Sequence, residues 1–151
     1  MDGLIFKLDE QFINNYFLNL LKESKLEYFV KNLFIKINFN SFHIVFDFFL
    51  NKNFTKIDFE LFLIEVPKRL FKDNFKLSYK GDKDLKKILE GITKIFLRVV
   101  PSINFEDDIM ILSLEKAEFL EDKIKKIFED FVIKQFLMDN GQIVVRSNFI
   151  N

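Results

Sequence analysis

Residues 29–65 read FVKNLFIKINFNSFHIVFDFFLNKNFTKIDFELFLIE, and this stretch decides the fold that the chain is predicted to adopt. Apolar side chains alternate with other residues over three segments, which the polar breaks Asn40-Ser41 and Asn51-Lys52-Asn53 separate. Successive side chains of a β-strand point to opposite faces, so this period of two is typical of strands with one buried face. The stretch therefore predicts three long antiparallel strands, and long strands twist into a strongly curved sheet.

One face of these predicted strands is wholly apolar, and it is the candidate ligand-lining surface. Sites for apolar ligands are lined mostly by hydrophobic side chains with few polar anchors. The predicted lining residues are Leu33, Ile35, Ile37, Phe39, Phe42, Ile44, Phe46, Phe48, Phe59, Leu61 and Leu63. The alternative is that helices from elsewhere in the chain fill this face as ordinary core.

The opposite face is apolar only in part, and it is the candidate interface. Its apolar residues are Phe34, Val45, Phe49, Phe62 and Ile64. Either a helix of the chain covers this patch or another protein does. Internal cover is favoured because apolar patches usually become core. The alternative is a homodimer or a subunit of a larger assembly.

The rest of the chain predicts helices and further strands around this sheet. Helical spacing of apolar residues places α-helices at 9–23, 84–98 and 117–130. Asp9 and Asp84 are the predicted N-caps of the first two helices, and Pro101 ends the second. Further strands are predicted at 75–79 and 109–114, and a hairpin joins 131–138 to 142–149 through Asp139-Asn140-Gly141.

These elements predict an α+β fold in a single domain, residues 1–151. Its sheet is expected to be one long, strongly curved antiparallel β-meander, packed with about three α-helices and followed by the C-terminal β-hairpin. A chain of 151 residues is long enough to bury a core without disulfides or metals.

Composition excludes several functions. Lys+Arg and Asp+Glu both number 23, so there is no basic surplus of the kind that nucleic-acid binders carry. The chain has no Cys, which removes thiol catalysis and thiolate metal sites. It has 22 Phe and a single Ala, Ala117, a bias that the codons of an AT-rich genome explain. The placement of the Phe residues is therefore more informative than their number.

The residues that could carry chemistry do not form a recognisable catalytic pattern. His43 is the sole histidine, and Asp47 on the same strand face is about 13 Å away at strand rise. Glu106-Asp107-Asp108 is acidic but lacks the spacing of a calcium loop. We find no nucleophile turn and no phosphate-binding glycine loop. The sequence thus predicts no enzyme, no cofactor and no metal.

The order of elements resembles that of a known family. The opening helix begins LDEQFIN at residues 8–14, amphipathic strands with a continuous apolar face follow, and the next helix ends at Pro101 before more strands. This pattern is similar to small bacterial members of the tubular lipid-binding (TULIP) superfamily. The resemblance implies a curved sheet wrapped around a helix and an apolar ligand. Those proteins are normally exported, whereas this sequence shows no export signal.

The expected function is that of a non-catalytic binding protein for a lipid or other apolar ligand, held against the Phe-rich sheet. The alternative is a structural or interaction protein that acts as a homodimer or as a subunit of an assembly. The partners expected are an apolar ligand or a protein, not nucleic acid. No apolar run reaches the roughly 18–20 residues of a membrane span. The expected location is cytoplasmic, or exported if a leader has been removed.

Overall fold

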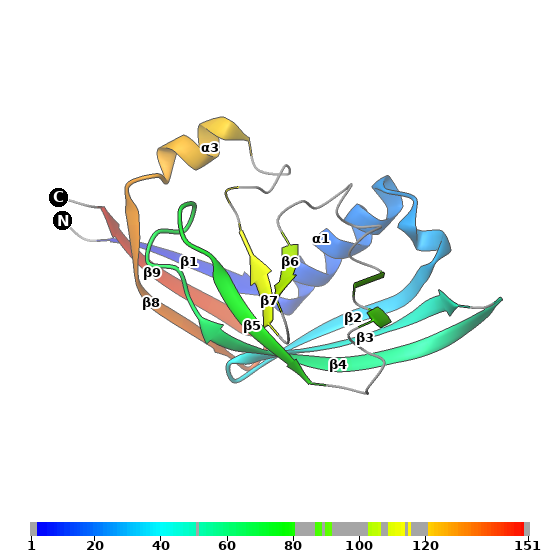
Figure 1. Ribbon diagram of the computed structural model, residues 1–151. Coiled ribbons are helices and arrows are strands. Elements are labelled where there is room, and N and C mark those ends of the chain that lie inside the picture. The colour runs from blue at the N-terminus through cyan, green and yellow to red at the C-terminus, as the bar shows by residue number, and fades with distance from the viewer. Residues whose placement is uncertain are drawn as a thin grey trace.

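Two antiparallel sheets make up most of the chain (Figure 1). The computed structural model describes residues 3–50, 52–80, 87–88, 90–91, 103–106, 109–113, 115 and 121–149. The smaller sheet has the strand order β1 (Leu4–Asp9), β9 (Gln142–Phe149), β8 (Phe131–Asp139). The larger sheet has the order β2 (Val30–Asn38), β3 (Ser41–Leu50), β4 (Asn53–Glu65), β5 (Phe75–Lys80), β7 (Ile109–Leu112), β6 (Ile103–Glu106).

The three predicted strands of residues 29–65 are confirmed as β2, β3 and β4. They pair antiparallel, and the register places Ile35 beside Ile44 and Ile44 beside Phe59. Both connecting turns contain a residue with a left-handed backbone, Asn40 at φ 50° and Lys52 at φ 72°. Asn tolerates this conformation better than most residues. Apolar alternation and short polar turns therefore set the pairing of these strands.

The first helix is also confirmed, as α1 (Glu10–Glu23). The carboxylate of Asp9 accepts a hydrogen bond from the backbone N–H of Phe12 at 2.8 Å, as expected of an N-cap. At the other end the backbone N–H of Ser24 donates to the carbonyl of Leu20. Lys25 then adopts a left-handed backbone at φ 62°, which ends the helix. A single turn of 3-10 helix, η1 (Leu26–Tyr28), leads into β2.

Polar side chains of α1 close the free edge of β2. Asn14 donates from Nδ2 to the carbonyl of Ile35 and accepts from the N–H of Ile35 through Oδ1, both at 2.8 Å. Glu10 accepts from the N–H of Ile37 at 2.7 Å. The N–H of Gly141 donates to the carbonyl of Ile37 at 2.9 Å. An open edge would expose these groups to pairing with other chains, so the helix replaces a missing strand.

The β8–β9 turn joins the same corner of the molecule. Gly141 accepts a hydrogen bond from the N–H of Glu10 at 2.9 Å. The N–H of Asn40, in the β2–β3 turn, donates to the carbonyl of Met138 at 3.1 Å. The start of α1, the β2–β3 turn and the β8–β9 turn therefore meet, and Figure 1 shows the two sheets converging there.

The predicted C-terminal hairpin is confirmed in strands β8 and β9. Asn140 and Gly141 have φ angles of 47° and 77°, as both central residues of a type I′ turn require. Asp139 pairs with Gln142 across this turn.

The predicted α+β class is confirmed, but the predicted single curved meander with about three α-helices is wrong. The strands divide into two sheets, and β7 and β6 extend the larger one out of chain order. Two strands, β1 and β6, were not predicted. The apolar segment of β1 does not alternate. In β6 apolar and polar residues do alternate, but over four residues only, the shortest run that can indicate a strand.

Two α-helices have both ends within the described residues, α1 and the six-residue α3 (Asp122–Ile127). The helix predicted at 117–130 is shorter than expected because residues 128–130 form a turn into β8; residues 117–120 lie outside the described residues. Of the helix predicted at 84–98, residues 87–88 and 90–91 are described and are helical. The rest of that helix, with Asp84 and Pro101, lies outside the described residues. No helix in the described ranges is long and apolar enough to cross a membrane.

Replacing Asn14 with Ala tests the closure of the β2 edge. The change leaves the N–H and C=O of Ile35 without their side-chain partners, so we expect the free energy of unfolding to fall by about 2–3 kcal/mol. Asn19→Ala is the matched control, since Asn19 is an exposed residue of the same helix; its effect should stay within about 0.5 kcal/mol. Urea unfolding followed by circular dichroism measures both. Equal effects of the two substitutions would contradict the edge role of Asn14.

Candidate functional site

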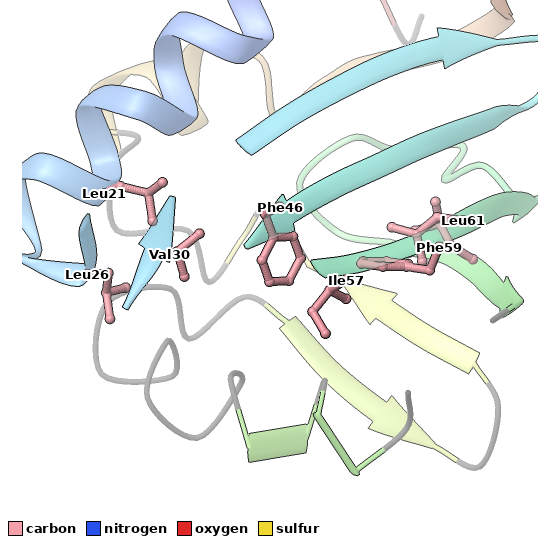
Figure 2. Packing of buried hydrophobic residues seen from close by; sticks show 8 residues of the cluster. Leu21, Leu26, Val30, Phe46, Ile57, Phe59 and Leu61 are labelled. Atoms are coloured by element: carbon pink, nitrogen blue, oxygen red, sulfur yellow. The ribbon is translucent and has the colours of Figure 1, made fainter. Parts of the chain in front are cut away.

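The inner face of the larger sheet, defined as the face that carries Phe46, Ile57, Phe59 and Leu61, packs into the main core. Figure 2 shows these side chains pointing to one side of β3 and β4, with Leu21 of α1 nearby. The rings of Phe46 and Phe59 meet edge to face at 6.3 Å between centroids. The buried members of this cluster are Leu21, Leu26, Val30, Phe46, Ile57, Phe59, Leu61 and Leu77.

A second buried cluster lies at the corner where the sheets meet. Ile37 of β2 packs there with Met138 of β8 and Ile143 of β9. Phe42 packs against both clusters and so connects them. The two sheets therefore share apolar contacts as well as the backbone hydrogen bonds of the corner.

The structure brings ten of the eleven predicted lining residues onto the inner face. Five of them are buried: Ile35, Ile37, Phe46, Phe59 and Leu61. Five are half-buried: Leu33, Phe42, Ile44, Phe48 and Leu63. Phe39 lies instead in the β2–β3 turn and is 72% exposed. The alternation predicted Phe39 on the inner face, but β2 ends at Asn38 and Phe39 already belongs to the turn.

The outer face of the same sheet holds the predicted interface residues in three separate groups. Phe34 lies beside Val45 in the middle of the sheet. Phe62 and Ile64 lie toward one end of β4, and Phe49 lies at the other end. Cross-strand charged rows separate the groups, since Lys36, His43 and Glu60 are register neighbours and so are Asp47 and Lys56. Val45 is half-buried and the other four are exposed, so the internal cover favoured from the sequence is not seen for these four.

His43 lies on this outer face and contacts a carboxylate that the sequence did not suggest. Its Nε2 is 2.5 Å from Oδ1 of Asp58, which lies diagonally across the β3–β4 pair. The register of the hairpin would have revealed this neighbour, because Leu50 pairs with Asn53 and the pairing then runs back along both strands. Both side chains are at the surface, so the pair is worth at most about 1 kcal/mol.

The described residues offer no evident metal site. Among them no group of three or more His, Asp or Glu residues could hold a metal ion. Of the acidic run 106–108, only Glu106 is described, and it belongs to β6.

One perturbed titratable group belongs to α1. Burial first, and the nearby carboxylate of Glu23 second, raise the pKa of Tyr16 above its ordinary value. Its ring packs edge to face on Phe17 at 5.4 Å between centroids. The phenol therefore keeps its proton at neutral pH, and the aromatic contact points to a packing role.

Four exposed aromatic residues gather where β2 begins and the β3–β4 hairpin ends. We call Tyr28, Phe29, Phe49 and Phe54 the aromatic tip; their exposed fractions run from 39% to 67%. The N–H of Phe49 donates to the carbonyl of Phe29 at 2.8 Å, and the rings of Phe49 and Phe54 lie 5.2 Å apart. Of these four, only Phe49 belongs to the predicted interface, because the tip combines η1 with a hairpin that is distant in sequence.

A shallow hollow of about 240 Å³ lies elsewhere, between residues 66–68 and the start of β8. It forms where β8 is irregular between Ile133 and Gln135 and the N–H of Ile133 donates to the carbonyl of Lys68. None of the predicted lining residues borders it.

Comparisons of the chain with protein-family models, with curated proteins and with solved structures find no match. Function is therefore inferred from the inner face, the outer face and the aromatic tip.

Truncating two Phe residues should separate core from surface. Phe46→Ala removes a buried ring of the main core and should lower the free energy of unfolding by about 3–5 kcal/mol. Phe39→Ala removes an exposed ring at the turn and should change it by no more than about 0.5 kcal/mol. Thermal unfolding of both variants beside the unmodified chain gives the comparison. A large loss with Phe39→Ala would show that the turn packs against something else.

Proposed function

We propose that this protein is a non-catalytic binding protein that holds a lipid or other apolar ligand against the inner face of the larger sheet. One observation carries the proposal. Leu33, Ile44 and Phe48 are only half-buried although they lie on the inner face, and they rest on the fully buried core. An apolar surface of this kind suits a ligand with few polar groups.

The positions of the polar groups support a role without catalysis. His43 lies on the outer face, at the surface, in contact with Asp58. Glu10 and Asn14 hydrogen-bond the backbone of β2, so their polar atoms serve the fold. A ligand on the inner face would meet mostly hydrocarbon from these strands.

The similarity to TULIP proteins is part of the same proposal and concerns architecture. Two residues of the similar segment, Asp9 and Asn14, have structural roles in this chain, as helix cap and as edge partner of β2. The proposal of an apolar ligand therefore depends on the half-buried inner face and not on these residues.

A tryptophan reporter tests the proposed ligand surface, because the chain has no natural Trp. We expect a brominated fatty acid to quench the fluorescence of a Phe48→Trp variant, since residue 48 lies on the inner face. A Phe34→Trp variant is the matched control on the outer face and should be quenched far less. Equal quenching of the two, or none at residue 48, would contradict the proposal. Native mass spectrometry of gently purified protein would then identify any ligand by its mass above 18.2 kDa.

A second candidate function is that of an interaction protein acting through the outer face. Phe34 and Ile64 favour it, because they are 52% and 54% exposed. If this face joins two copies, sedimentation equilibrium should give a dimer, and Phe34→Lys should weaken it at least tenfold because a charge would be buried. A monomer at high concentration would contradict self-association.

A further inference from the structure

The aromatic tip brings together four exposed aromatic side chains, and backbone bonding and strand pairing connect the segments that carry them. Backbone hydrogen bonding joins Phe29 to Phe49, and register pairing joins Phe49 to Phe54. Figure 1 shows this end of β3 and β4 reaching away from both chain termini and from the corner where the sheets meet. Insertion of the tip into a membrane would therefore leave the core in place.

The segments that carry these rings hold more lysines than acidic residues. The tip is built from residues 22–31, 47–50 and 52–56, which together hold five lysines against three acidic residues. The ammonium of Lys31 lies 4.7 Å from the centroid of the Phe54 ring, a cation–π contact. Asp47 accepts a hydrogen bond from Asn32 and lies opposite Lys56 in the strand register, so this carboxylate and this lysine offset each other and two positive charges remain in excess. Lysines with long apolar stems can keep their charge in water while the stems lie on an apolar surface.

Two of the lysines occupy unusual backbone positions beside the tip. Lys25 and Lys52 have positive φ angles of 62° and 72°, where Gly or Asn is usual. Both side chains are exposed. Lys25 lies at the entry to η1, and Lys52 lies in the β3–β4 turn, so each borders the aromatic tip. Lysine is a poor choice for these turns on conformational grounds, which points to a use for the charge.

We propose that the aromatic tip docks this protein onto a membrane surface rich in anionic lipid. The rings would lie at the boundary between headgroups and acyl chains, and the lysines would contact lipid phosphates and carboxylates. A protein partner fits less well, because a stable interface buries roughly 600 Å² or more on each partner. Four aromatic side chains that are only 39–67% exposed supply less than that. The inference rests on the proposed function in one respect: docking would bring the protein close to a source of apolar ligand.

Co-sedimentation with vesicles tests the docking. The full chain should bind vesicles of phosphatidylcholine and phosphatidylserine at about seven to three, and bind pure phosphatidylcholine much more weakly. Lys52→Glu should weaken binding about 30-fold, because it reverses one charge next to the membrane. Phe54→Ser should weaken it about tenfold through loss of apolar burial. Raised salt should weaken binding of the unmodified chain.

Matched substitutions away from the tip serve as controls. Phe39→Ser removes an exposed ring at the opposite end of β2, and Lys123→Glu reverses an exposed charge on α3. Neither should change vesicle binding more than about twofold if the tip is the docking site. Lys52 lies in an exposed turn, so its variant should fold even if Phe54→Ser does not, as circular dichroism will show.

The docking inference is overturned if the unmodified chain does not bind the anionic vesicles, or if the control substitutions weaken binding as much as those at the tip. It is also overturned if Phe54→Ser dissociates a dimer while vesicle binding persists, because the tip would then be an interface between copies. The two proposals fail separately. Loss of docking with quenching at residue 48 intact refutes the tip alone, and docking without that quenching refutes the ligand surface alone.

Discussion

The structure depends on how the free edge of β2 is closed. A strand at the edge of a six-stranded sheet presents unpaired N–H and C=O groups, which invite pairing with other chains. Here the backbone groups of Ile35 and Ile37 are all bonded, by the side chains of Asn14 and Glu10 and by the backbone of Gly141. Because Glu10 and Asn14 lie four residues apart, they project from the same side of α1 and reach two alternate residues of the strand. One helix face thus substitutes for a strand.

This closure also arranges the surfaces from which function is inferred. It sets α1 beside β2, which lets Leu21 join the main core and holds the β8–β9 turn against the β2–β3 turn. Asn14 and Glu10, the polar side chains of α1 that reach the sheet, hydrogen-bond the backbone of β2. They therefore place no polar group on the inner face, which stays apolar. The opposite end of β3 and β4 lies far from this corner (Figure 1). At that end the aromatic rings of the tip are exposed, and so are Lys25 and Lys52. One end of the protein therefore holds the packed corner, and the other end carries the exposed aromatic tip.

Local patterns predicted the local parts of this structure. The alternation in residues 29–65, the cap at Asp9 and the Asn140-Gly141 turn each act within a few residues, so the sequence alone indicated them. What was missed depends on strand register or on chain segments that are far apart in sequence. The partner of β1 is at the other end of the chain, the contact of His43 with Asp58 follows from hairpin register, and the tip combines η1 with β3–β4. The role of Asn14 was missed for the same reason, because nothing near it in the sequence shows that its amide will face a strand edge.

Amide hydrogen exchange at Ile35 and Ile37 tests the edge closure most directly, because it reports these two backbone groups in the unmodified protein. If α1 closes the edge, both amides should exchange only through large-scale unfolding and be protected to about the same degree as those in the interior strand β3. Exchange as fast as that of an uncovered edge strand, with β3 still protected, would contradict the account.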